Sequence, residues 1–167
     1  YRLGSSDTIG GLTGAGSADL NSKELTVSQS ASEATFSGII SGSTTSHLTK
    51  EGSGTLILSG ANTYQGNTSV NDGVLSVSGS LNDSTIVDVS SGATYRLGSS
   101  DTIGGLTGAG SVNLNSNELT VSQSASEATF SGIISGSTVT SHLKKAGQGT
   151  LTLSGDNTYQ GNTSVNA

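Results

Sequence analysis

Paired carboxylates are the side chains of this 167-residue sequence that could do acid–base chemistry. Glu24 and Glu33, if brought together across neighbouring strands, could serve as the general acid and the general base of a polysaccharide-cleaving enzyme. Both recur further along the chain, as Glu118 and Glu127. Arrays of identical catalytic sites are uncommon and solvated acidic strand residues are common, so we interpret all four as surface residues. We predict that the chain is not an enzyme and has no catalytic residues.

Two histidines could bind a metal ion. His47 and His142 hold equivalent positions, each beside a leucine. A protein metal site needs several ligands at close spacing, and no second histidine lies near either one in the sequence. The sequence also lacks cysteine, which excludes a thiolate metal site and a disulfide scaffold. We therefore predict no metal site and interpret both histidines as solvated residues on strands.

A glycine-rich stretch at residues 10–16 raises the question of a phosphate-binding loop. Its sequence is Gly-Gly-Leu-Thr-Gly-Ala-Gly. A phosphate cradle lies between a strand and a helix, and the amino-terminal N–H groups of the helix bind the anion. The residues that follow, Ser17 to Leu20, are typical of a strand instead. We predict a corner turn at the glycines and no bound cofactor.

The net charge of the chain argues against some classes of partner. It carries 12 acidic residues against 6 lysines and arginines, a formal net charge of -6. This balance argues against nucleic acid and anionic membranes as partners. No apolar run approaches membrane-spanning length, so we predict that this segment is not membrane-embedded. Proline is absent, which fits a structure of paired strands, because a proline removes one donor from the hydrogen-bond ladder.

The sequence contains two long copies of one segment. Residues 1–72 return as residues 95–167, with nine substitutions and one inserted residue in the stretch Thr138-Val139-Thr140. We predict two units of one continuous structure. The first long repeat unit is residues 1–94, and the second, truncated unit is residues 95–167.

A shorter period runs inside each unit. Alternating apolar residues recur at residues 55–58, 74–77 and 94–97, each run followed by serine and glycine. One coil of a β-solenoid needs three short strands and three corners, or roughly 20 residues. No segment shows helical spacing. We predict an all-β fold, a parallel β-helix (β-solenoid) of about eight coils, with four to five coils in each long unit.

The differences between the copies indicate which side chains face inward. Ile57, between two leucines, becomes Thr152 in the second copy, and this exchange is cheap only on the outer surface of a strand. Six aromatic residues also occur as equivalent pairs, and we interpret them as packing residues, with sugar stacking along a groove as the alternative. These pairs are Tyr1 with Tyr95, Phe36 with Phe130, and Tyr64 with Tyr159.

One stretch resembles a known family. Residues 54–70 read Gly-Thr-Leu-Ile-Leu-Ser-Gly-Ala-Asn-Thr-Tyr-Gln-Gly-Asn-Thr-Ser-Val, and residues 149–165 repeat the pattern. Both are similar to the passenger-associated repeat of bacterial autotransporters, whose pattern is Gly-Thr-Leu-x-Leu-Ser-Gly-x-Asn-x-Tyr-x-Gly-x-Thr-x-Val. The resemblance implies a right-handed parallel β-helix on the surface of a Gram-negative bacterium. It also implies a signal peptide upstream and attachment to the outer membrane through a C-terminal β-barrel, neither present in this sequence.

Two functional hypotheses follow. In the first, the repeats form a rod-like stalk of an autotransporter adhesin that supports cell adhesion, self-association or biofilm formation. Its partner is the same array on a neighbouring cell, or a host or matrix ligand. In the second, the β-helix binds or cleaves a polysaccharide in a groove of paired carboxylates or exposed aromatics. An ice-binding solenoid would need regular Thr-x-Thr ladders, which Ile57 breaks. The sequence assigns no binding residues.

Overall fold

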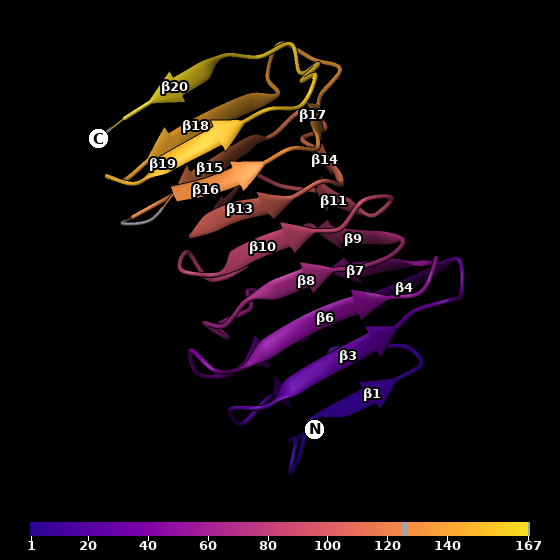
Figure 1. Cartoon of the computed structure of the whole chain (residues 1–167). Helices are drawn as coiled ribbons and strands as arrows, with labels where there is room; N and C mark the ends of the chain where they lie inside the picture. Colours follow the sequence, from indigo (N-terminus) through magenta and orange to yellow (C-terminus); the bar gives the residue numbers. More distant parts are fainter. Residues whose placement is uncertain (125–126, 167) are drawn as a thin grey trace.

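Parallel strands wound into one continuous coil form the part of the chain that the structure describes. The structure is a computed structural model that describes residues 1–124 and 127–166. Over these residues it contains strands and no helix. Figure 1 shows the near strands running from left to right while the chain climbs from its N-terminus to its C-terminus, which makes the coil right-handed. The predicted right-handed parallel β-helix is confirmed.

Three faces make up each coil, and the chain visits them in a fixed order. The first face is a sheet of eight strands whose order follows the sequence. Eight coils therefore stack along the axis, as predicted. The strands of the first face are β1 (Asp7–Ile9), β3 (Glu24–Ser28), β6 (His47–Glu51), β8 (Thr68–Val70), β10 (Ile86–Val89), β13 (Gly105–Gly108), β16 (Glu127–Phe130) and β19 (Thr150–Leu153).

The second and third faces are formed by the strands that follow in each coil. The second face is one sheet of β4 (Glu33–Phe36), β7 (Thr55–Leu58), β9 (Val74–Val77), β11 (Thr94–Leu97), β14 (Ser111–Asn113) and β17 (Ile133–Ser135). The third face consists of two shorter sheets. An isolated bridge between Ala61 and Ser80 falls between these two sheets in the sequence. Its strands are β2 (Ala18–Asp19), β5 (Ile40–Ser41), β12 (Asp101–Ile103), β15 (Glu118–Ser122), β18 (His142–Ala146) and β20 (Thr163–Val165).

Stacked rows of apolar side chains fill the interior. On the second face Leu56 pairs in register with Leu75, and Leu75 pairs with Tyr95. All three side chains are fully buried, and burying a side chain of this size contributes about 1.5–3 kcal/mol each. Ile57, between the two inward leucines of β7, is only half-buried and points outward. The alternation predicted from the two copies is confirmed.

The long repeat unit does not contain a whole number of coils. From β1 the chain completes four coils, through β3, β6 and β8 to β10, and then crosses two more faces with β11 and β12. Because β12 is the copy of β1, one unit spans four and two-thirds coils. Copies of one strand therefore lie on different faces. For example, β3 lies on the first face and its copy β15 on the third, while β4 lies on the second face and its copy β16 on the first.

The glycine-rich stretch differs from its prediction in the second copy. Gly105–Gly108 is strand β13, which pairs with β10 and β16 instead of forming a corner. A side chain at Gly108 would collide with the backbone of Val89 in the neighbouring coil, and the φ angle of Gly108 is +107°. Glycine thus permits a close approach of two coils here. In the first copy no described residue other than its chain neighbours lies within 4 Å of the place that a side chain at Gly14 would take, and Gly14 makes an isolated bridge to Phe36.

Candidate functional site

The proposed acid and base residues lie apart. Glu24 begins β3 on the first face, and Glu33 begins β4 on the second face, after a corner. Both are exposed. The Glu24 carboxylate accepts a hydrogen bond of 2.7 Å from the Thr49 hydroxyl of the next coil, whereas Glu33 stands in register with Thr55. Their copies, Glu118 and Glu127, lie on the third and first faces. Glu24 and Glu33 therefore do not form the neighbouring carboxylate pair that a glycosidase needs.

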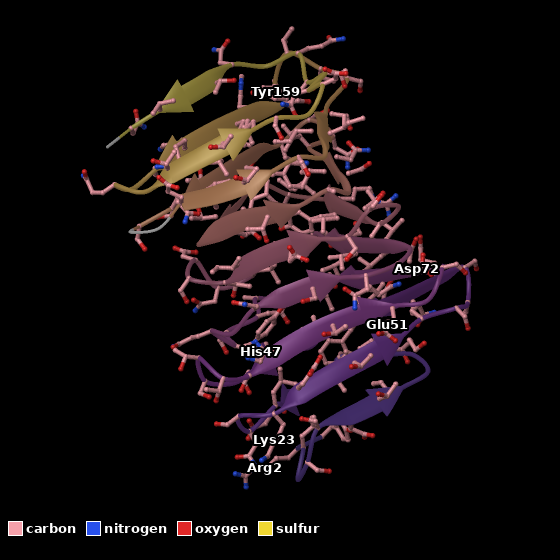
Figure 2. The ribbon with its side chains drawn as sticks, in the orientation of Figure 1. Arg2, Lys23, His47, Glu51, Asp72 and Tyr159 are labelled. Atoms are coloured by element: carbon pink, nitrogen blue, oxygen red, sulfur yellow. The ribbon has the colours of Figure 1, made fainter. Side chains whose placement is uncertain are left out.

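The aromatic side chains lie mostly inside the coil. Tyr64 is fully buried, and its hydroxyl shares a hydrogen bond with Thr68. Burial raises the pKa of Tyr64 above its ordinary value. Phe36 and Phe130 are also buried, so packing, as predicted, is what these residues do. Tyr1, by contrast, is exposed at the N-terminal end of the coil. Figure 2 labels Tyr159, partly buried in the last coil.

Each histidine links two coils. The Nδ1 atom of His47 accepts a hydrogen bond of 2.9 Å from the Asn67 N–H, and His142 accepts the same bond from Asn162. Both rings are half-buried. Nδ1 must be unprotonated to accept, which places the ring proton on Nε2. The histidines are therefore corner contacts in both copies, and less solvated than the sequence suggested. No group of three potential ligand side chains within residues 1–124 and 127–166 could hold a metal ion.

A buried lysine escaped the sequence interpretation. The Nζ atom of Lys50 donates to the carbonyls of Glu51, Gly52 and Asp72, at 2.8, 2.6 and 3.1 Å. Its side chain is fully buried, and burial lowers its pKa despite the nearby Asp72 carboxylate. Lys145 repeats the first two bonds. The signal was alternation, because Leu48 and Lys50 have the same parity and both must point inward.

A buried carboxylate lies between the two ends of the β-helix, away from its first and last coils. Asp101 is 8% exposed, and its Oδ2 atom accepts hydrogen bonds from the Leu81 N–H at 3.1 Å and the Tyr95 hydroxyl at 3.4 Å. Burial, with a smaller contribution from the charge of Asp83, raises the pKa of Asp101 to about 6. Its copy in the first unit, Asp7, is exposed. The sequence could not distinguish the two, because the residues around them are identical.

Seven hydroxyl side chains and one carboxylate form the central outward row of the first face. In register from coil to coil it contains Thr8, Thr26, Thr49, Ser69, Asp88, Thr107, Thr129 and Thr152. The Thr107 hydroxyl donates to Asp88 at 2.6 Å. A parallel threonine row is missing beside it, since Thr150 stands in register with Glu127. The row offers many weak hydrogen-bonding groups and lacks the paired ladders that the ice-binding hypothesis requires.

The main hollow of the described chain lies at its C-terminal end. Leu143, Leu151 and Leu153 line it, together with Val165. The equivalent leucines of the first unit are fully buried, because β8 and β9 of the following coil cover them. The hollow is therefore uncovered core, and its shape gives no reason to assign a small-molecule ligand.

Comparisons with known proteins agree with the motif. Residues 48–77 and 143–167 match the passenger-associated-transport-repeat family. The chain is also 36% identical over 151 residues to a curated protein of Brucella suis biovar 1 (strain 1330), Adhesin BmaC autotransporter. The similarity covers 86% of this chain but 4% of that protein, so the chain spans a small part of its relative's length. No solved structure is significantly similar to the chain.

Proposed function

The chain is a passenger-repeat segment of the autotransporter adhesin type, and on that premise we propose that it forms a stiff stalk section that also contacts neighbouring copies of itself. The observation that carries the proposal is the uninterrupted stacking of eight coils over two long copies. At about 4.8 Å per coil, eight coils make a rod section roughly 40 Å long. Each further unit lengthens such a rod without altering its cross-section.

The outer surface supports a contact role. The central row of the first face presents hydroxyl groups from most of its coils, with Asp88 in one coil and the buried Thr49 in another. Hydroxyls both donate and accept hydrogen bonds, so one such surface can pair with another of the same kind. Each contact is weak, but many contacts along two rods act together. Self-association, adhesion and biofilm formation all fit this surface.

The location is part of the proposal. Segments of this type belong to adhesins of the bacterial surface, so we place the stalk outside the outer membrane, attached through a part of the protein beyond this segment. No helix among the described residues is long and apolar enough to cross a membrane. A host or matrix ligand is the other partner that this exposed polar surface would suit.

A mixed-cell settling experiment tests the proposal. Bacteria that display the 167-residue segment are mixed with differently labelled bacteria that display the same protein without it. We expect displaying cells to clump with each other and to exclude the control cells. Dispersal of the displaying cells would contradict self-association, and only the stalk role would remain. Equal inclusion of both labels in the clumps would indicate a different partner on the cell surface.

A further inference from the structure

The fractional repeat turns the surface of each unit relative to the previous one. Since one unit spans four and two-thirds coils, a side chain and its copy lie about 22 Å apart along the axis, at about 4.8 Å per coil, and one third of a turn apart around it. The strand pairs show this directly: β4 belongs to the second face and its copy β16 to the first, β5 to the third face and its copy β17 to the second.

One outward strip is the same in both copies. We define the hydroxyl strip as Thr35, Ser37, Ile39 and Ser41, with its copy Thr129, Ser131, Ile133 and Ser135. Exposed and buried residues alternate along both stretches in the same pattern, across the corners at Gly38 and Gly132. The Ser37 and Ser131 hydroxyls donate to equivalent carbonyls, those of Gly14 and Gly108, at 3.3 and 3.2 Å. The hydroxyl strip therefore has the same local geometry in both copies, and its two copies face different directions.

An isoleucine that is exposed in both copies distinguishes this strip from the rest of the described surface. Ile39 and Ile133 are 47% and 46% exposed, and they are the equivalent pair of large apolar residues that stays exposed in both copies. Elsewhere the copies differ: Tyr1 is exposed while Tyr95 is buried, and Val165 is exposed while its counterpart in the first unit is buried. The isoleucines are thus not exposed merely because they lie at an end of the coil.

The chemistry of the strip fits a second copy of this chain. No charged residue occurs from Thr35 to Ser46, or from Thr129 to Ser141. An uncharged strip offers no opposite charge to a strongly basic or acidic partner. Two such strips can meet about a two-fold axis, with isoleucine on isoleucine and hydroxyl on hydroxyl, since a hydroxyl can donate to its own kind.

We propose that the repeats form a three-sided display, in which each unit offers its hydroxyl strip to another copy of the chain in a direction one third of a turn from the last. The proposal rests on self-association under the proposed function and specifies its geometry. A single strip would close a two-fold dimer, after which no contact remains free. Two strips that face different ways leave one strip free on each chain of a dimer, so assembly continues into bundles.

Sedimentation velocity of the purified 167-residue chain tests this geometry. All variants share a Val165→Lys background, because a lysine at this exposed end position opposes end-to-end stacking. We expect the background chain to form species larger than dimers as concentration rises. Ile39→Glu or Ile133→Glu alone stops assembly at the dimer, and the double variant weakens association at least about tenfold, as loss of a central apolar contact does. Ile86→Glu, at an exposed isoleucine without a copy, is the matched control and leaves assembly unchanged.

Other outcomes overturn the display or part of it. A single variant that abolishes all association means that one strip does the binding, and single variants that still grow past the dimer exclude the strip. Association that survives in the double variant also excludes the strip, while clumping in the settling experiment would keep the proposed function. A background chain that stays monomeric at every concentration, while displaying cells clump, overturns the display alone. Circular dichroism confirms that each variant keeps its β structure.

Discussion

The two copies of one tyrosine–aspartate pair share their sequence and differ in their surroundings. Tyr1 is exposed and donates a hydrogen bond of 2.8 Å to Asp7, whereas Tyr95 is fully buried and donates to the buried Asp101. Tyr95 stacks in register on Leu75 of β9, which belongs to the preceding coil. In this architecture the neighbouring coil decides whether a residue belongs to the core.

Truncation of the two tyrosines should give the largest difference in stability between the copies. We expect Tyr95→Ala to lower the free energy of unfolding by about 3–5 kcal/mol, because it leaves a cavity inside the coil. Tyr1→Ala should lower it by about 0.5 kcal/mol or less, as is usual for exposed residues. Denaturant unfolding followed by circular dichroism measures both. Equal losses would mean that the end of the coil is packed as tightly as its middle.

Lys50 and its copy Lys145 differ in burial in the same way as the tyrosines. Lys50→Met removes the donor to three carbonyls, and buried carbonyls without partners cost about 1–3 kcal/mol in total stability. Lys145 is half-buried in the last full coil, so water can replace its hydrogen bonds and Lys145→Met should cost about half as much or less. Midpoints of denaturant unfolding distinguish the two variants. A larger loss at Lys145 would contradict the assignment of the end coil as solvated.

Acid should stabilise the middle of the chain through Asp101. Its pKa is raised to about 6 in the folded protein, so the folded state binds this proton more tightly than the unfolded state. The contribution of Asp101 to the free energy of unfolding therefore rises as pH falls from about 7 to about 4, by roughly 1–2 kcal/mol. Unfolding curves across this range measure it.

A matched pair of variants isolates that contribution. Asp101→Asn should remove the rise, and Asp7→Asn, at the exposed copy, should leave it in place. A pH profile that is unchanged by Asp101→Asn would assign the rise to other groups.

The smallest expected effect concerns the outer surface. Ile57→Thr introduces in the first unit the residue that the second unit already has. Because Ile57 is half-buried and points outward, the free energy of unfolding should fall by about 0.5 kcal/mol or less. Leu56→Thr, on the inward side of the same strand, serves as its control and should cost several times more. Similar losses for the two variants would contradict the inward and outward assignment.

Local patterns in the sequence predicted much of the coil. The alternation around Ile57 identified the inward side of β7, and the recurrence of such runs predicted coils of about 20 residues. The face on which each strand lies could not be predicted, because the fraction of a coil in one unit depends on the sum of many corner lengths. Lys50 was missed because a charged residue on an inward position contradicts ordinary burial preferences. The glycine strand β13 depends on the close backbone of Val89, which no local pattern reveals.

Gain or loss of one whole repeat unit would change the direction in which the coil faces as well as its length. Adding one unit of four and two-thirds coils moves everything beyond it outward by about 22 Å at about 4.8 Å per coil, and also swings it through one third of a revolution. Residues beyond the added unit would face a different side of the rod after one duplication, and three duplications would restore the original direction. In the proposed stalk, each single duplication therefore changes both the length and the direction in which the far end faces.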